Sequence, residues 1–288
     1  MSEFTGKETT GLPHRAIGAI LVDAGRLSPD NAERILQLQR ESGQSFGQAA
    51  ISLGLLTQAD IELGLSRQFD FPYLLKGESK VSQELIAAYD PFCTQVEALR
   101  ALRSQLMMRW FNSAEHTALA IISPERNEGR SFLAANLAVA LSQLGKRTLL
   151  IDADMRNPRQ HTLFGLPNRS GLSAILSGRN DMDAIVRIPS LIDLSVLPAG
   201  AIPPNPQELL ARPLFQQLLQ ELTRRYDAIL IDTPATDGFA DAQSVAARTG
   251  AALVVARKDT SRMRTVRNLV DTMHQASILV VGTVLNEF

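Results

Sequence analysis

From residue 118 onward, short hydrophobic runs alternate with longer amphipathic stretches. The runs are rich in Val, Ile and Leu and do not alternate apolar with polar positions. Strands of this kind are buried on both faces, as in a parallel sheet that helices cover on each side. We expect six strands, at 118–122, 148–151, 194–197, 228–231, 252–256 and 278–285, with intervening helices such as 131–144 and 206–225. The pattern predicts an α/β domain with a doubly wound parallel sheet.

The first seventy residues instead contain an internal repeat with a period of 29 residues. Equivalent positions carry the same residue in three pairs: Gly18 and Gly47, Gly25 and Gly54, and Gln39 and Gln68. Each copy predicts a short helix, a glycine C-cap, a Ser or Thr N-cap and a longer helix. Ser28 stands before a proline, and Thr57 with Asp60 has the spacing of a capping box. Two copies would form a small all-α domain.

These patterns divide the chain into four segments. We expect a flexible, polar N-terminus over residues 1–14 and the helical repeat domain over 15–75. A linker is expected over 76–94, because a polar cluster occupies 76–80. The α/β domain then covers 95–288.

Composition and charge narrow the classes of protein. The 29 Lys and Arg and the 30 Asp and Glu leave a net charge of −1, so no global basic excess favours nucleic acid. Cys93 is the single cysteine and the four histidines are scattered, which excludes a cysteine cluster and disfavours a histidine metal site. The longest apolar run, 251–256, is far shorter than the ~20 residues of a membrane span, and the N-terminus lacks an export signal. We therefore expect a cytoplasmic protein.

The first predicted strand leads into a turn and a helix that together form a candidate anion site. Residues 123–131 are Ser-Pro-Glu-Arg-Asn-Glu-Gly-Arg-Ser. Backbone N–H groups and the positive end of the helix dipole would converge there. Gly129 and Ser131 fit the P-loop pattern Gly-x-x-x-x-Gly-Lys-Ser/Thr, whereas Pro124 replaces its first glycine and Arg130 its lysine. An ordinary strand–helix turn is the alternative.

Three carboxylates follow two of the later predicted strands. Asp152 and Asp154 end the second strand, and Asp232 ends the strand at 228–231. In open α/β sheets the ligand binds outside these strand ends. Carboxylates beside a phosphate site would repel the phosphates unless a cation intervened, and Mg²⁺ with Ser131 and outer-sphere aspartates suits this arrangement. The alternative is that each Asp caps the helix that follows it.

Together the loop, the Asp-x-Asp-x-Arg sequence at 152–156 and Asp-Thr-Pro at 232–234 resemble the bacterial tyrosine kinases of capsule and exopolysaccharide export. The resemblance covers about 90–286 and includes Glu97-x-x-Arg100-x-x-Arg103. Within that family the loop and the N-terminal repeat look most like the EpsG group, soluble kinases that act with an inner-membrane chain-length determinant protein. The fold that the resemblance implies is a P-loop NTPase-type doubly wound parallel sheet, with ATP and Mg²⁺ as cofactors.

The resemblance also implies a role for each matching residue. Arg130 would contact the β- and γ-phosphates, Asp152 would accept the tyrosine proton or hold the metal, and Asp154 would support it. Ser131, Asp152 and Asp232 would form the metal site. The ATP-binding residues would be Ser123, Pro124, Glu125, Arg126, Asn127, Glu128, Gly129, Arg130, Ser131, Phe132 and Asn286. Asn286 stands where related ATPases contact the base, or is a strand-end cap.

Charged positions bear on assembly. Glu97, Arg100 and Arg103 lie on one helical stripe, which in this family marks a ring-forming contact between subunits and otherwise is a solvated face. Partition and cell-division ATPases carry Lys at the second loop position, where this chain has Glu125, so a dimer switch of that type is disfavoured. A basic cluster at 257–267 is either a solvated helix face or a surface for an acidic partner or the anionic membrane.

The tyrosines and the repeat leave two questions open. Family members usually end in a tyrosine-rich tail, whereas Phe288 comes soon after the last predicted strand, so we expect the substrate tyrosine on another protein or at Tyr73, Tyr89 or Tyr226. An ATP-binding, ring-forming scaffold without phosphoryl transfer is the alternative function. The repeat resembles the N-terminal domain of type II secretion and pilus assembly ATPases, some of which bind cyclic di-GMP. Ala16 and Ser45 stand at that motif's arginine positions, which disfavours this ligand.

Overall fold

The computed structural model describes residues 16–68, 73–74, 77, 79–179 and 182–287. The chain divides into two compact units, 1–72 and 73–288. The expected flexible segment 1–14 lies outside the described residues. No helix of the described part is long and apolar enough to cross a bilayer.

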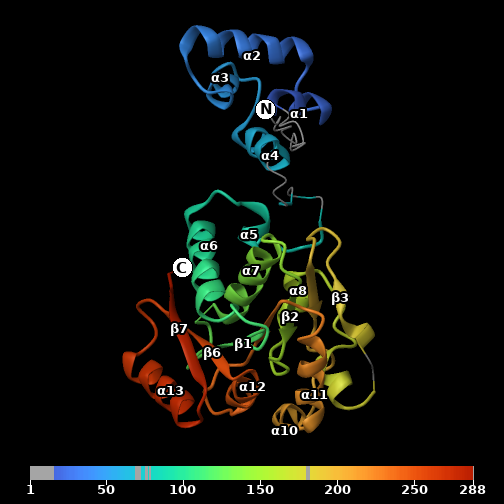
Figure 1. Ribbon diagram of the computed structural model, residues 1–288, viewed down its shortest axis with the longest axis vertical. Coiled ribbons are helices and arrows are strands. Elements are labelled where there is room, and N and C mark those ends of the chain that lie inside the picture. Colours follow the sequence, from blue (N-terminus) through green and yellow to red (C-terminus); the bar gives the residue numbers. More distant parts are fainter. Residues whose placement is uncertain (1–15, 69–72, 75–76, 78, 180–181, 288) are drawn as a thin grey trace, which may run out of the picture. The chain divides into compact units, whose positions relative to one another are not determined.

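The first unit contains the four predicted helices of the repeat (Figure 1): α1 (Ile17–Asp23), α2 (Pro29–Ser42), α3 (Phe46–Ser52) and α4 (Gln58–Gln68). Gly25 and Gly54 have φ values of 67° and 66°, the left-handed conformation that ends each short helix. Ser28 caps α2, and Thr57 and Asp60 exchange the hydrogen bonds of a capping box. The repeat prediction is confirmed in both copies.

The second unit is built on a seven-stranded sheet. Its strands are β1 (Ala118–Ile122), β2 (Thr148–Asp152), β3 (Val186–Arg187), β4 (Leu194–Leu197), β5 (Ala228–Asp232), β6 (Ala251–Arg257) and β7 (Leu279–Asn286). The strand order is β3-β4-β2-β5-β1-β6-β7, and all neighbours are parallel except β3 and β4. The six predicted strands are confirmed, and β3 is an addition at one edge. β7 forms the other edge and is partly exposed, so the prediction of burial on both faces fails for this strand.

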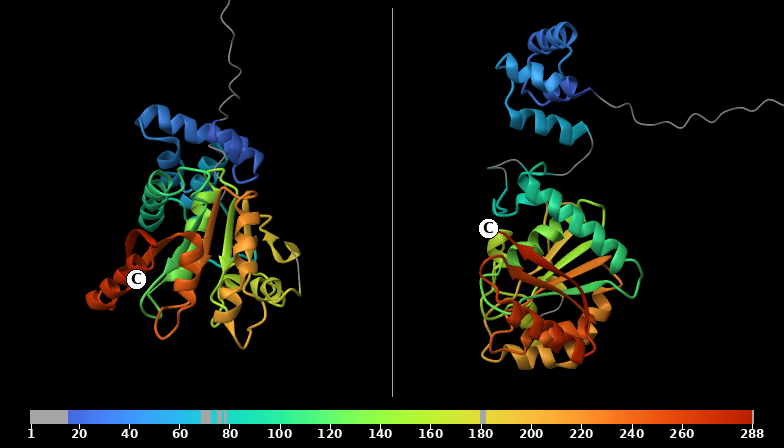
Figure 2. Two further views of the ribbon diagram at one scale, coloured as in Figure 1. Left: turned by 60° about the horizontal axis from the view of Figure 1, so that its bottom comes forward. Right: turned by 90° about the vertical axis from the view of Figure 1, so that its left-hand side faces the viewer.

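Helices cover both faces of the sheet (Figures 1 and 2). On one face lie α5 (Ile86–Tyr89), α6 (Thr94–Arg109), α7 (Arg130–Ser142) and α8 (Gln160–Leu163), above alternate strand positions such as Leu119 and Ile121. The other face carries α9 (Leu172–Leu176), α10 (Pro206–Ala211), α11 (Pro213–Leu222), α12 (Asp241–Thr249) and α13 (Met263–Gln275), above Ala120 and Ile122. A 3-10 turn, Met182–Ala184, precedes β3. The carboxyl ends of the strands therefore lie between two helical layers, each packed on the sheet through a buried core.

The helix expected over 206–225 is two helices, because Arg212 adopts an extended conformation (φ −63°, ψ 147°) before Pro213. A residue before proline is forced out of the helical region, so the break has a local cause.

The expected linker over 76–94 is mostly part of the second unit. We call residues 79–90 the strap. Val81, Leu85 and Tyr89 are buried in its core, and the Tyr89 hydroxyl donates to the Val81 carbonyl over 2.7 Å. The buried amide of Asn136 on α7 accepts from the N–H of Ala87 and donates to the carbonyl of Glu84. The linker was predicted from the polar cluster at 76–80, whereas the apolar residues that follow this cluster pack into the core.

Candidate functional site

The segment 123–131 joins β1 to the N-terminus of α7. Gly129 has a φ of 127° and Asn127 a φ of 59°, conformations that favour glycine and asparagine respectively. Pro124 is buried, Arg126 and Asn127 are exposed, and Phe132 is half-buried on α7. Because α7 begins here, its free N–H groups and dipole favour an anion at the loop.

A buried glutamate braces this loop from inside. Glu128 is fully buried, and its Oε2 accepts the N–H of Glu125 over 2.7 Å. Its other carboxylate oxygen accepts the hydroxyl of Ser261, which follows β6. The Asn286 side chain donates to the Glu128 carbonyl over 3.1 Å, so Asn286 ties the end of β7 to the loop. These contacts hold the loop against the strands on its β6 side.

The Arg130 guanidinium forms hydrogen bonds with neighbouring protein groups. Its Nε donates to the Thr233 carbonyl over 2.8 Å, and Nη1 donates to the Glu125 carbonyl over 2.9 Å and to the Ser123 hydroxyl. These bonds fasten the loop to the end of β5. The predicted contact of Arg130 with phosphates therefore depends on its remaining Nη2 group.

Asp152 and Asp232 are direct neighbours at the ends of β2 and β5, and both are fully buried. Asp152 Oδ2 accepts the N–H groups of Arg159 and Gln160 over 3.0 and 2.9 Å. Burial, and next the charge of Asp232, raise the pKa of Asp152 well above its usual range. Burial also raises the pKa of Asp232 to about 6, although Arg130 and hydrogen bonds from Gln160 and Ser131 oppose it. Two carboxylates in this position require a cation or a shared proton.

Gln160 connects this pair to the loop. Its amide donates to Asp232 Oδ2 over 2.7 Å and to the Ser131 carbonyl over 3.1 Å. Gln160 was not among the predicted site residues, because an amide on a short helix carries no sequence signal. Asp154 differs from Asp152 in that it lies on a cavity wall, where its Oδ1 accepts the N–H groups of Arg156 and Asn157.

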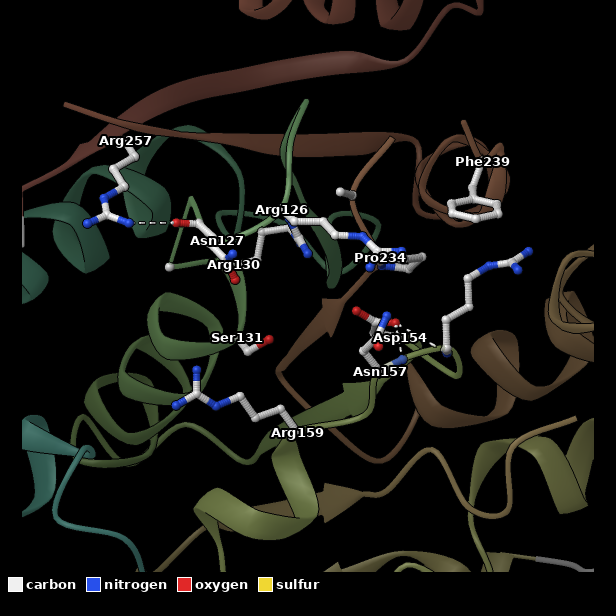
Figure 3. A pocket seen from close by; sticks show the side chains of 13 residues that line it. Arg126, Asn127, Arg130, Ser131, Asp154, Asn157, Arg159, Pro234, Phe239 and Arg257 are labelled. Carbon is white, nitrogen blue, oxygen red and sulfur yellow. Dashed lines mark hydrogen bonds between the residues drawn. The ribbon is translucent and has the colours of Figure 1, made fainter. Parts of the chain in front are cut away.

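A cavity of about 410 Å³ lies over these strand ends (Figure 3). Its wall includes Gly129, Ser131, Asp154 and five arginines, namely Arg126, Arg130, Arg156, Arg159 and Arg257. Five cationic side chains around one acidic side chain make a strongly electropositive cavity. Its size is within the range of small-molecule sites, and its charge suits a polyanion.

Two of these arginines, Arg156 and Arg257, were not among the predicted site residues, although Arg156 ends the Asp-x-Asp-x-Arg sequence. Arg156 pairs with the buried Asp241 at the start of α12 over 2.6 Å and stacks on Phe239 with 3.8 Å to the ring centre. Arg257, expected in a basic helix face or partner surface, precedes α13 and donates to the Asn127 carbonyl. Both therefore belong to the cavity wall.

The predicted subunit-contact stripe is divided in the structure. Glu97 and Arg100 form an ion pair on α6, and the Glu97 side chain is 63% exposed. Arg103 instead donates to the Ala140 carbonyl on α7 over 2.8 Å. Glu97 is therefore the exposed member of the stripe, whereas the Arg100 side chain is 20% exposed and Arg103 is half-buried against α7.

The acid pair fits an outer-sphere Mg²⁺ site. Asp232 Oδ1 is buried and has no hydrogen-bond partner among the described residues, and the Ser131 hydroxyl bonds to the same carboxylate. No group of three or more His, Cys, Asp or Glu in the described part could hold a metal by itself. A cation here would take Ser131, phosphate oxygens and waters as ligands, with Asp152 and Asp232 behind the waters.

Fold and loop define an α/β domain of the P-loop NTPase type. A family model described as cellulose biosynthesis protein BcsQ matches residues 117–282. The tyrosine-protein kinase wzc of Salmonella typhi is 35% identical over 213 residues, 74% of this chain and 30% of that protein. The solved kinase domain of the Escherichia coli tyrosine kinase ETK is 32% identical, with a TM-score of 0.66 over 70% of this chain and 79% of that one. The chimerical protein CapA2B2 is 34% identical, with a TM-score of 0.67 over 78% of this chain and 98% of that one.

The chain therefore belongs to the bacterial tyrosine-protein kinases, with residues 117–282 matching the BcsQ family model. The aligned part spans 30% of the length of the wzc relative.

Proposed function

We propose that this chain binds ATP with Mg²⁺ in the arginine-lined cavity and transfers the γ-phosphoryl group to a tyrosine. The observation that carries the proposal is the pair Asp152 and Asp232, buried side by side beneath a cavity with five arginines. The arginines would neutralise the triphosphate, and the acid pair would require the cation that accompanies it. Phosphoryl transfer needs chiefly this positioning and charge neutralisation.

The two aspartates of the 152–156 sequence take different roles in this proposal. Asp154 lies on the cavity wall, and none of the described residues donates to its Oδ2, so this oxygen would accept the tyrosine proton. The tyrosine oxygen would then bond to the γ-phosphorus as the bond to the β-phosphate oxygen breaks and ADP leaves. Asp152 and Asp232 would orient waters of the Mg²⁺ shell, and Ser131 would ligate the ion, which supplies charge neutralisation to the phosphates.

We further propose that the kinase acts at the cytoplasmic face of the inner membrane in exopolysaccharide synthesis, as a member of the EpsG group. Its partner would be a separate chain-length determinant protein. A ring of protomers would use Glu97, Arg100 and Arg103 on α6, of which the Glu97 side chain is 63% exposed. The two helical repeats of the first unit support its likeness to the secretion ATPase domain.

The test is to incubate the full chain with Mg-ATP and the cytoplasmic segment of such a membrane protein, and to map phosphotyrosine by mass spectrometry. We expect phosphotyrosine that disappears in Asp154→Asn and Asp152→Asn. Asp183→Asn changes an acid that is not in the cavity wall and is the matched control. ATP binding without phosphotyrosine would contradict the kinase proposal.

One observation favours a second function. Three donors of Arg130 are bound to the protein, and Pro124 replaces the first glycine of the loop. A protein that binds ATP and assembles without transferring phosphate would show this arrangement. ATP-dependent assembly that persists in Asp154→Asn, with no phosphotyrosine in the parent protein, would establish that scaffold.

A further inference from the structure

The cavity arginines differ in how firmly the protein holds them. Arg130 is buried and bound through three hydrogen bonds, and Arg156 is paired with the buried Asp241. Arg159 instead pairs with Glu84 at the surface, where the two side chains are 51% and 48% exposed. In Figure 3 the Arg159 side chain points away from Asp154 and Asn157.

Arg159 stands between the acid pair and the strap. Its own N–H donates to Asp152, while its guanidinium reaches Glu84. The strap is further joined to this region through the Ser82 N–H, which donates to the Leu163 carbonyl at the end of α8 over 2.8 Å. Arg159 therefore links Asp152 of the acid pair to the segment that follows the boundary between the two units.

The Arg159–Glu84 pair is weak enough for a nucleotide to break. Exposed ion pairs contribute little to stability, because water screens the charges and two long side chains must be ordered. A triphosphate carries several negative charges, and the planar guanidinium binds phosphate through two hydrogen bonds at once. Phosphate oxygens in the cavity would therefore compete successfully with a single exposed carboxylate.

We propose that Arg159, on the cavity wall, is a phosphate-binding residue whose guanidinium stays paired with Glu84 until the nucleotide arrives. The inference rests on the proposed binding of ATP in this cavity. Exchange of Glu84 for phosphate removes one attachment of the strap, so nucleotide binding is transmitted to the segment that leads to the helical unit. Because a ligand shifts such an equilibrium only through its different affinity for the two states, Glu84 must oppose ATP binding.

The experiment measures the Kd of a fluorescent ATP analogue, in the presence of Mg²⁺, for the full chain and three variants. Glu84→Gln removes the competing charge and is expected to bind about two- to fivefold more tightly. Arg159→Ala is expected to bind about tenfold more weakly. In the double variant the Glu84→Gln effect disappears, so its Kd equals that of Arg159→Ala. High salt screens the ion pair and reduces the gain from Glu84→Gln.

Asp227→Asn is the matched control, because Asp227 forms an exposed ion pair with Arg147 just before β5, at the opposite ends of the strands. Its Kd is expected to stay at the parent value. A parent protein that binds no nucleotide would overturn the proposed function together with this inference. A parent that binds, with Glu84→Gln unchanged or weaker, would overturn the role of Arg159 alone. Both substitutions are at exposed positions, and unchanged thermal midpoints would confirm that the variants fold.

Discussion

Asp152 on β2 and Asp232 on β5 occupy paired positions of adjacent parallel strands, and neither side chain is exposed to solvent. This relationship places two carboxyl groups with raised pKa values directly beneath the cavity. It makes the stability of the nucleotide-free protein and its binding of Mg²⁺ depend on pH in opposite directions.

The first prediction concerns that pH dependence. Burial raises the pKa of Asp232 from 3.8 to about 6, so the folded state holds a proton that the unfolded chain releases. Stability of the nucleotide-free protein should therefore fall as pH rises through that interval, by about 2–3 kcal/mol for this group. Binding of Mg²⁺ should strengthen over the same range. Urea unfolding and Mg²⁺ titrations across it measure the two trends.

Asp232→Asn should remove the part of the stability trend that Asp232 contributes and make the nucleotide-free protein more stable at pH about 8, while Mg²⁺-dependent activity is lost. Asp227→Asn is the control with the opposite sign, because the hydrogen bond from Arg147 lowers the pKa of Asp227. An Asp232→Asn protein less stable than the parent at this pH would contradict the prediction.

Gln160 should matter more than an ordinary polar residue on a helix. Its amide donates to a buried carboxylate and to the loop carbonyl of Ser131. Gln160→Ala should cost about 1.5–3 kcal/mol of stability, because a charged acceptor loses its donor. Gln217→Ala, at an exposed position of α11, should change stability by less than about 0.5 kcal/mol. Equal effects in chemical denaturation would refute the bridging role.

Substitution of Gly165 and of Gly145 distinguishes the cost of a strained backbone conformation from the cost of a steric clash. Both have positive φ values, 63° and 75°, but only a Cβ on Gly165 would meet the strap, at 2.5 Å from the Lys80 carbonyl oxygen. Gly145→Ala should cost about 1 kcal/mol, since the residue is strained but nothing is in its way. Gly165→Ala should cost clearly more, because the strap must move. Thermal unfolding of the two variants gives the comparison, and equal losses would show that the strap yields freely.

Tyr89 should not be a phosphorylation site. Its hydroxyl is buried and donates to the Val81 carbonyl, so it cannot reach a phosphoryl group without opening the strap. Tyr89→Phe should lose about 1–2 kcal/mol of stability and leave the phosphotyrosine signal unchanged. Tyr226→Phe changes a half-buried tyrosine and serves as the comparison in the same mass spectra. A phosphate found on Tyr89 would contradict this view of the strap.

The helical unit should not bind cyclic di-GMP. At the arginine positions of the binding motif stand Ala16 and Ser45, and Ser45 is the N-cap of α3 in a capping box with Gln48. Calorimetric titration of the full chain at micromolar ligand should show no heat. Ser45→Arg would replace that cap with a cation and is the variant to compare; heat with the parent protein would refute the prediction.

Local sequence determined most of the elements. The β1, β2, β5 and β6 runs, the glycine-ended short helices and the Thr57 capping box all form as predicted, because each depends on residues close together in the chain. The break before Pro213 was also present locally, in a proline that stands inside an apparently continuous helix. The prediction of a linker over 76–94 was wrong, because the burial of Val81 and Leu85 depends on partners that α7 and the sheet supply.

Some residues of the candidate site could likewise be predicted from the sequence, and others could not. Ser131, Asp152 and Asp232 could be named from their places after strands, since parallel strands bring their carboxyl ends together. Only the tertiary structure decided that Asp154 lies on the cavity wall and that Gln160 and Arg159 complete the site. The turn of Arg130 toward Thr233 likewise depends on residues about a hundred positions apart. Side-chain burial and hydrogen-bond partners follow from which distant segments meet, and one segment's sequence does not contain that information.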